Sequence, residues 1–426
     1  MLNFLKSKES QNAIWLISGK VIQMVLSLLI GIITARYLGP GNYGLINYGT
    51  AFTTFFAALC GLGINSVIIK DFVEHPEEQG ESIGSALVMK IGSSVLSVIM
   101  IVGIVSFLDR DEPLTISVAA LCGLGSVFHV FDTFNYWFQN RYQSKVISFV
   151  TLIAYLATSL YRIVLLICNK DVRWFALATS VDYIVMAILL YLLYKKNGGP
   201  SLKFSFKKSK SLLSMSYHYI LSGMMIAIYG QTDKIMLKFM LTEADVGYYS
   251  TATTICGMWT FVLMAIIDSF YPTILRLFAT DKAGYDRKNK QLYAIVFYIS
   301  LVVSMFFTVA GSVVVKILYG QEYIESINPL KIVTWYTAFS YLGVARNAWI
   351  VSEGKQKYLK YMYCAAAIIN VILNLILIPA WGASGAAIAS LITQIFTSIV
   401  LPCFFKEMRY NVKLMLESIL LKGVIK

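Results

Sequence analysis

The chain alternates long apolar runs with short polar intervals along its whole length. A run of about 20 apolar residues can cross the hydrocarbon core of a bilayer as an α-helix. The pattern predicts an all-α integral membrane protein with about twelve transmembrane helices. The predicted helices cover residues 13–35, 43–69, 86–108, 113–138, 146–168, 173–194, 214–239, 245–275, 291–318, 327–351, 360–379 and 383–405.

The composition supports this interpretation. Of the 426 residues, 58% are hydrophobic and 14% are charged. The mean hydropathy is +0.68, which lies outside the range of water-soluble globular domains. A soluble chain of this length would hold two or three domains, but the polar intervals here are too short for a separate aqueous domain.

The basic residues fall mainly on one side of the predicted topology. The chain has 36 Lys and Arg and 23 Asp and Glu, which gives a net charge of +13. Both termini lie on the side with 24 basic residues, and the opposite side holds 7. The positive-inside rule therefore predicts cytoplasmic termini and makes nucleic-acid binding an unneeded hypothesis. The N-terminus lacks a small-residue cleavage site, so we expect its first helix to be retained.

A basic segment divides the chain nearly in half. It begins at Lys195 and reads KKNGGPSLKFSFKKSKS, with six lysines and a Gly-Gly-Pro break. This composition is typical of a cytoplasmic linker. The predicted organisation is an N-terminal six-helix lobe, a linker, a C-terminal six-helix lobe and a cytoplasmic tail, at residues 1–194, 195–212, 213–405 and 406–426.

The two halves resemble each other at two equivalent positions. LGPGNYGLINYGT, which contains Gly44, matches LTEADVGYYSTAT, in which Gly247 takes the same place. WFQNRYQSK from Trp137 similarly matches WIVSEGKQK from Trp349. Repeats of six helices insert in the same orientation, so we expect two pseudo-symmetric lobes related by an axis along the membrane normal. A substrate site is then expected in a central cavity between them.

Polar residues inside four predicted helices recur at spacings that place them on one helix face. A charge in hydrocarbon costs at least about 2.5–3.5 kcal/mol, so a charge kept there should face a bundle interior or a water-filled cavity. The polar stripes are Lys20, Gln23, Ser27 and Thr34; His129, Asp132 and Tyr136; Thr151, Tyr155, Thr158 and Arg162; and His218, Ser222, Met225, Tyr229 and Asp233.

The intramembrane cations have two interpretations. In the first, Lys20, Arg162 and Arg346 line the cavity and supply positive charge for an anionic headgroup. In the second, intramembrane aspartates neutralise these cations and hold helices together without touching substrate. The sequence leaves both interpretations open.

Other polar residues are candidates for cavity lining or ion coupling. They are His129, Asp132, Asp182, His218, Asp233, Lys234 and Asp268. The histidines are more typical of a packed core, and Asp233 and Lys234 are equally well explained as an interfacial pair near a helix end. Asn370 and Asn374, one turn apart, are predicted to form interhelical hydrogen bonds.

The chain contains no familiar enzyme motif. GxxxxGK[ST], HExxH and GxSxG are all absent, so we predict no enzyme activity, no catalytic residue and no cofactor. The six cysteines lie mostly in apolar runs without metal-ligand spacing, and we interpret them as packing residues rather than a metal site. Aromatic residues at predicted helix ends, including Trp137, are typical of an interfacial belt.

Two segments carry a resemblance to a known family. They are ARYLGPGNYGLINYGTAFTTFFAALCGLGINSVIIKDF from Ala35 and GQTDKIMLKFMLTEADVGYYSTATTI from Gly230. With the WFQ turn at Trp137, they resemble the polysaccharide-biosynthesis exporters, the Wzx-type O-antigen and repeat-unit flippases. This family belongs to the multidrug/oligosaccharidyl-lipid/polysaccharide (MOP) flippase superfamily. The resemblance covers essentially the whole chain.

The resemblance implies two six-helix lobes around a central cavity that opens alternately to each side. It implies that an oligosaccharide on undecaprenyl diphosphate is flipped from the cytoplasmic to the outer leaflet of a bacterial plasma membrane. The partners would be this lipid-linked sugar and membrane lipid, with a polysaccharide polymerase and glycosyltransferases as candidate protein partners. Lys20, Arg162 and Arg346 match the cavity cations of the family by chemistry and depth only.

Three alternatives remain. A cation-coupled multidrug antiporter of the same superfamily would carry more acidic and fewer basic cavity residues. A lipid II flippase would usually have helices beyond the twelve predicted here. A membrane polysaccharide polymerase or ligase would have a long outer loop with arginines and histidines, whereas every predicted outer loop here is short.

Overall fold

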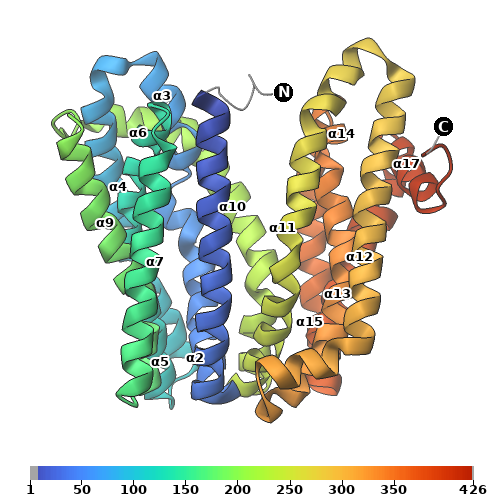
Figure 1. Cartoon of the computed structure of the whole chain (residues 1–426), viewed down its shortest axis with the longest axis horizontal. Coiled ribbons are helices and arrows are strands. Elements are labelled where there is room, and N and C mark those ends of the chain that lie inside the picture. The colour runs from blue at the N-terminus through green and yellow to red at the C-terminus, as the bar shows by residue number, and fades with distance from the viewer. Residues whose placement is uncertain (1–7, 425–426) are drawn as a thin grey trace. The chain divides into compact units, whose positions relative to one another are not determined.

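The computed structural model describes residues 8–424, with side chains from Gln23 onward, as helices joined by short turns and without a β-strand in that range (Figure 1). The elements before the basic linker are α2 (Lys8–Gly61), η1 (Ile64–Ser66), α3 (Ile68–Glu74), η2 (Pro76–Glu78), α4 (Gln79–Leu108), α5 (Pro113–His129), η3 (Val130–Asp132), α6 (Thr133–Asn140), α7 (Ser144–Ile167), α8 (Val172–Ala176) and α9 (Ala178–Lys196). Those after it are α10 (Phe206–Met240), α11 (Glu243–Thr280), α12 (Lys282–Leu318), η4 (Gln321–Ser326), α13 (Ile327–Ala345), α14 (Asn347–Ser352), α15 (Lys357–Ile395), the π-helix η5 (Phe396–Val400), α16 (Leu401–Phe404) and α17 (Arg409–Ile419).

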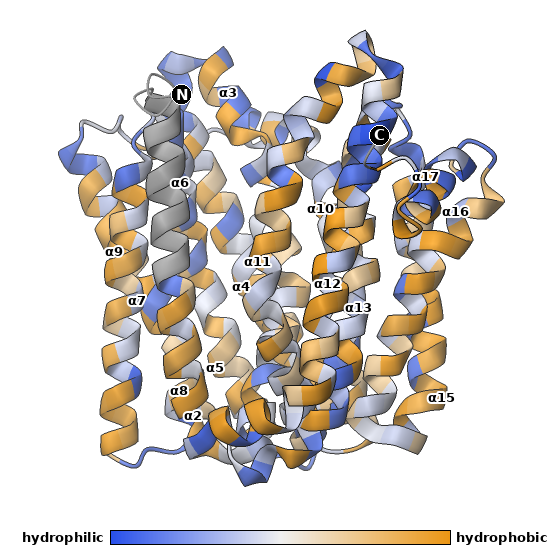
Figure 2. Cartoon of the chain, turned by 45° about the vertical axis from the view of Figure 1, so that its right-hand side comes forward, coloured by the Kyte–Doolittle hydropathy of each residue, from blue (hydrophilic) through white to orange (hydrophobic). Residues whose placement is uncertain are grey.

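Nine helices in the described part of the chain are long and apolar enough to cross a membrane. Figure 2 shows their hydrophobic middles in orange and the more hydrophilic connections in blue. The prediction of an all-α membrane protein is confirmed at this level. The count differs from twelve because α2 and α15 each combine two predicted spans that meet at a non-helical glycine and are counted once, while α13, the predicted tenth span, is not among the nine.

Both long helices bend at a glycine. In α2 the bend lies at Gly39, which has φ 70° and precedes Pro40. In α15 it lies at Gly382, which has φ 55°, three residues after Pro379. Positive φ is readily available to glycine, and proline removes a backbone donor, so both bends follow from local sequence.

The chain divides into two compact units. The first contains residues 1–38 and 45–231, and the second contains residues 39–44 and 232–426. In the first unit, Phe134, Trp137 and Phe138 lie in a core cluster with Tyr194. Trp137 is fully buried, so the prediction that it belongs to an interfacial belt is wrong. The second unit has its own core, in which Trp349 is buried.

The two glycines aligned by the internal repeat lie against each other in the second unit. A Cβ added to Gly44 would lie 2.9 Å from the backbone nitrogen of Gly247 and 1.7 Å from the carbonyl oxygen of Glu243. A Cβ added to Gly247 would lie 2.1 Å from the carbonyl oxygen of Pro40. Neither site has room for a larger residue, so glycine at these positions permits backbone-to-backbone packing.

The basic linker packs on α4 in the first unit. Added Cβ atoms at Gly80 and Gly84 would lie 2.3 Å and 2.4 Å from the carbonyl oxygens of Ser201 and Lys203. The amide of Lys203 donates to the Gly80 carbonyl at 3.2 Å. Lys208 is buried and pairs with Asp71 at 3.1 Å. Specific contacts therefore hold this part of the predicted linker on the helix.

Candidate functional site

A buried lysine joins two helix interruptions in the first unit. Asn65 lies in η1, just after α2 ends, and Asp132 lies in η3, between α5 and α6. Lys90 from α4 reaches both, with its Nζ 2.5 Å from Asn65 Oδ1 and 3.1 Å from Asp132 Oδ1. Lys90 also donates to Thr133 Oγ1 at 2.9 Å, and Asn65 Nδ2 donates to Asp132 Oδ2 at 3.2 Å. One ammonium group therefore holds three separate segments together.

Burial makes this ion pair structurally important. The side chain of Lys90 is 2% exposed and that of Asp132 is 12% exposed. All three donors of the ammonium group have partners, which is what a buried charge requires. Removal of one partner from a buried pair costs about 3–5 kcal/mol because the other charge is left without compensation. Asp132 is therefore neutralised by Lys90.

His129 lies beside this network. Its Nε2 is 4.0 Å from Asp132 Oδ2, and its side chain is 47% exposed. The imidazole ring packs edge-on against Tyr183, with the ring centroids 4.6 Å apart. His129 is thus accessible, within reach of a carboxylate and held by an aromatic neighbour. The arrangement differs from the packed core histidine that the sequence alone favours.

Asp182 connects α9 to the polar stripe of α7. Its Oδ1 accepts a hydrogen bond from Thr158 Oγ1 at 3.2 Å. Arg162 lies one helical turn beyond Thr158, is partly exposed and lies close enough to interact electrostatically with Asp182. The predicted face of α7 therefore faces a carboxylate on its neighbour. Arg162 interacts with Asp182, and because its side chain is also partly exposed, it can bind an anion at the same time.

The second unit contains a buried carboxylate of a different kind. Asp233 on α10 is 6% exposed and accepts hydrogen bonds from three neutral side chains. Asn374 Nδ2 donates to Oδ1 at 2.7 Å, and Ser390 Oγ donates to Oδ2 at 2.6 Å. Tyr249 Oη also donates to Oδ2. Hydrogen bonds stabilise the ionised carboxylate, while its negative charge is not cancelled by these three donors.

The polar residues of α15 complete this site. Asn370 Nδ2 donates to Ser390 Oγ at 3.3 Å, and Asn374 Nδ2 also lies 3.1 Å from Asn370 Oδ1. The predicted interhelical hydrogen bond is confirmed for Asn374, which bonds to Asp233 on α10, whereas the bonds of Asn370 join residues within α15. Lys234, next to Asp233 in the chain, is partly buried. Lys238, one turn further, forms an ion pair with Glu243 at 3.5 Å.

Arg346 occupies the junction between α13 and α14 and is 5% exposed. Its Nη1 donates to the carbonyl oxygen of Ser398 at 3.1 Å, and its Nη2 lies 3.3 Å from Met362 Sδ. Ser398 belongs to the π-helix η5, a type of segment often found at functional sites. The Nε atom of Arg346 has no hydrogen-bond partner in the described part of the chain. This buried cation therefore retains capacity for an acceptor.

The other predicted residues do not join these clusters. The side chain of Lys20 lies outside the described residues. His218 is exposed and its ring lies 3.7 Å from that of its neighbour Tyr217. Asp268 on α11 is exposed. Over the described residues, no group of three His, Cys, Asp or Glu side chains has the geometry to hold a metal ion.

Several residues that complete the sites are absent from the sequence-based candidates. They are Asn65, Lys90, Tyr249 and Ser390. Lys90 had a detectable signal, since it is a charge in the middle of the apolar run ALVMKIGSSVL. The other three are common residue types at ordinary positions, and only their proximity to a carboxylate in space gives them a role.

Comparison with known proteins gives a consistent result. The family described as "Polysaccharide biosynthesis protein" matches residues 10–278. A "Putative O-antigen transporter" of Shigella flexneri is 20% identical, over 93% of this chain and 98% of its own. A second protein with that name, from Shigella dysenteriae, is 23% identical over 61% of this chain. The latter match covers 65% of the Shigella dysenteriae protein, just under two thirds of its length.

Solved structures share the fold. A multidrug resistance MATE family transporter of the MOP superfamily, in an inward-facing conformation, aligns with a TM-score of 0.68 and 15% identity, over 93% of this chain and 99% of its own. The lipid II flippase MurJ also aligns with a TM-score of 0.68 and 15% identity, over 97% of this chain and 92% of its own. At this identity the likeness concerns the architecture alone.

Proposed function

Because the matched region is more than half of its length, the chain belongs to the polysaccharide biosynthesis protein family, and we propose that it is a flippase for lipid-linked oligosaccharides. The family match carries this proposal, and the names of the two Shigella relatives support it. The proposed substrate is an oligosaccharide repeat unit on undecaprenyl diphosphate. It moves from the cytoplasmic to the outer leaflet of the bacterial plasma membrane for the synthesis of O-antigen, capsule or exopolysaccharide.

The proposed architecture is twelve transmembrane helices in two pseudo-symmetric six-helix lobes, with both termini in the cytoplasm. The lobes correspond to residues 1–194 and 213–405, joined by a linker at 195–212, and a tail follows at 406–426. Alternate opening to the two sides would carry the headgroup across the bilayer. A polysaccharide polymerase and glycosyltransferases are the proposed protein partners.

The main barrier to flipping is the dehydration of the diphosphate and its sugars. Two negative charges moving outward gain roughly 2.3 kcal/mol each per 100 mV of inside-negative potential, if they cross uncompensated. The membrane potential therefore favours outward movement of the diphosphate, whereas the transfer of its charges out of water is costly. In this proposal, Lys20, Arg162 and Arg346 replace part of the lost hydration. The partly exposed Arg162 and the free Nε of Arg346 support their assignment.

Asp233 is the proposed ion-coupling residue. Its carboxylate is buried and hydrogen-bonded by neutral donors, while the adjacent Lys234 acts on it through charge alone, so binding of a proton or a small cation would compensate the carboxylate further. Asp132 is less suited to this role because Lys90 already neutralises it. If Asp233 binds the coupling ion, the ion gradient would shift the equilibrium between the conformations that open to the two sides of the membrane.

The test is translocation of undecaprenyl-diphosphate oligosaccharide in proteoliposomes, followed with a membrane-impermeant probe of the sugar. We expect protein-dependent movement that is reduced in Arg162→Ala and retained better in Arg162→Lys. Exposed Lys282, paired with Glu353 at 2.8 Å, supplies a control variant, Lys282→Ala, that should flip normally. No movement by folded protein, with and without an imposed potential or ion gradient, would contradict the proposal. Drug efflux in the same vesicles would then favour a multidrug antiporter.

A further inference from the structure

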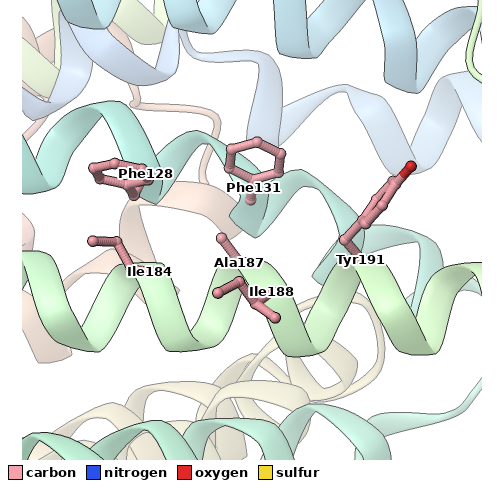
Figure 3. Close-up of a pocket in the computed structure, with 6 residues that line it drawn as sticks. All are labelled: Phe128, Phe131, Ile184, Ala187, Ile188 and Tyr191. Carbon is pink, nitrogen blue, oxygen red and sulfur yellow. The ribbon is translucent and has the colours of Figure 1, made fainter.

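An apolar groove runs along one face of α9 in the first unit (Figure 3). Four of its residues come from α9 at spacings of three and four, so they share one helix face, and two phenylalanines from α5 and η3 face them. The lining residues are Phe128, Phe131, Ile184, Ala187, Ile188 and Tyr191. The groove lies where α5 gives way to η3, so the helix interruption shapes one of its walls.

The size and lining of the groove suit a hydrocarbon chain. Its volume is about 380 Å³, within the usual range for small-molecule sites, and no polar atom lines it. Ala187 is buried and contributes only a methyl group, which leaves room between the larger side chains. Ile188 is 54% exposed, so the groove opens onto the surface of the unit. A hydrocarbon chain could therefore enter the groove laterally, past Ile188.

Positively charged residues lie at one end of the groove. Lys195 follows Tyr191 by one helical turn, and its Nζ is 4.9 Å from the centroid of the Tyr191 ring. The guanidinium of Arg141 lies 4.2 Å from the Trp137 ring centroid. Trp137 packs on Tyr194, with centroids 4.8 Å apart, and Tyr194 lies on the same helix as Lys195. A shared aromatic cluster thus brings both cations to the same end of α9.

These cations are available for an anion. Arg141, Lys195 and Lys196 are all exposed, and none forms an ion pair within the described part of the chain. Their positive charge is therefore not neutralised by nearby carboxylates. The rise of an α-helix puts Lys195 roughly 17 Å from Ile184 along α9, about the thickness of one hydrocarbon leaflet.

We propose that the groove and these three cations form a loading site for the polyprenyl diphosphate substrate in the cytoplasmic leaflet. The prenyl chain lies in the groove, and the diphosphate binds Arg141, Lys195 and Lys196. Three cations match a diphosphate better than the single charge of a common phospholipid, which identifies the occupant. The inference rests on the proposed function, which supplies the lipid-linked substrate, and on the predicted cytoplasmic location of the linker.

Photolabelling tests occupancy without requiring transport. The probe is undecaprenyl diphosphate with a diazirine on its chain, added to the purified full-length protein in lipid nanodiscs. We expect adducts on the α9 peptide that contains Ile184 to Tyr191 and on the peptide that contains Phe128 and Phe131. Unlabelled undecaprenyl diphosphate should compete, and phosphatidylglycerol at the same concentration should not.

Two variants separate the groove from the cations. Ala187→Trp should fill the groove and reduce labelling at least about tenfold, which corresponds to 1.4 kcal/mol of binding energy. The matched control is Leu160→Trp on α7, where the side chain is 63% exposed and outside the groove. The second variant, Arg141→Gln with Lys195→Gln and Lys196→Gln, changes only exposed residues and should lower labelling to a similar extent. It keeps the test valid if Ala187→Trp fails to fold.

The outcomes distinguish this site from the flippase function. If the wild-type protein is labelled on α9 but does not flip the lipid, the proposed loading site stands and the proposed flippase function is contradicted. If both variants still flip the lipid and are still labelled, the proposed flippase function stands and the proposed loading site is overturned. Equal competition by phosphatidylglycerol would also overturn it, because the groove would then hold ordinary membrane lipid.

Discussion

Asp132 and Asp233 are both shielded from solvent, but their partners differ. In the first unit, Asp132 faces the ammonium group of Lys90 and an asparagine amide. In the second unit, Asp233 faces a tyrosine, a serine and an asparagine. The first carboxylate is hydrogen-bonded by its counter-ion, whereas the second is hydrogen-bonded by neutral groups and interacts with Lys234 through charge alone.

The difference separates a structural role from a functional one. A fully bonded ion pair resists change, because separating or neutralising one partner leaves the other charge buried. A carboxylate with neutral donors can gain a proton or a cation and reduce the net charge of its surroundings. Lys90 and Asp132 are therefore expected to hold the first unit together, and Asp233 to respond to an ion.

The largest expected effect is the loss of the buried cation. Lys90→Met should destabilise the protein by about 3–5 kcal/mol, because Asp132 remains buried without its counter-ion. Thermal unfolding of the purified protein measures this. The double variant Lys90→Met, Asp132→Leu removes both charges and should recover part of the stability. An unchanged melting temperature in the single variant would show that the pair does not stabilise the fold.

A smaller loss is expected from one neutral donor of the second site. Tyr249→Phe removes a hydrogen bond to a charged acceptor but leaves Asn374 and Ser390 in place. Bonds of this kind contribute about 1.5–3 kcal/mol, which should again appear in thermal unfolding. Tyr361, which is 51% exposed, offers a control variant, Tyr361→Phe, that should unfold like the wild type. Equal stability of the two variants would argue against a strong bond at Asp233.

Neutralising Asp233 should affect transport more than folding. Asp233→Asn keeps the side-chain shape but cannot bind a coupling ion by charge. We expect flipping driven by a proton or sodium gradient to fall at least about tenfold, a change of 1.4 kcal/mol. Vesicle flux with and without the gradient is the measurement, and Asp111→Asn, at an exposed position in the turn between α4 and α5, is the control. Full gradient-driven flux in Asp233→Asn would exclude the proposed coupling role.

The smallest effect is expected from an exposed ion pair, which provides a baseline for the buried one. A hydrogen bond from Lys355 holds the pKa of Glu407 below its usual range. Its contribution is therefore present above the ordinary glutamate pKa of about 4.3 and is lost as pH falls through the lower folded value. The difference in melting temperature between wild type and Glu407→Gln should be small and should vanish in strong acid. A difference that persists there would contradict this assignment.

Much of the fold follows from the sequence because apolar runs of membrane-spanning length leave little choice of structure. The bend at Gly39 was less predictable, since a glycine and a proline between two apolar runs also suit a loop. The pattern separated 13–35 from 43–69, and α2 does consist of two helices that meet at the non-helical Gly39, but without a loop between them. The prediction that Trp137 lies in an interfacial belt was wrong for a related reason. A tryptophan near a helix end is compatible both with a membrane interface and with a protein core, and here it is buried.

The candidate sites were predictable only in part. Helical spacing identified Asp132 and Asp233 as polar positions in apolar surroundings. It could not identify their partners, because Lys90 is 42 residues from Asp132 and Ser390 is 157 residues from Asp233. Periodicity reports which side of a helix a residue occupies, and the partner depends on which helix packs there. Tertiary packing therefore decides between a neutralised carboxylate and a responsive one.

The docked linker sets where the chain can tolerate inserted sequence. Between Ser201 and Lys208 the backbone lies against Gly80 and Gly84, and the last lysine is buried with Asp71, so added residues would separate these contacts. Gly198 is exposed, has φ 71° and has open space around it. A reporter or epitope is therefore better placed at Gly198, and differences in linker length among relatives should be concentrated at this turn.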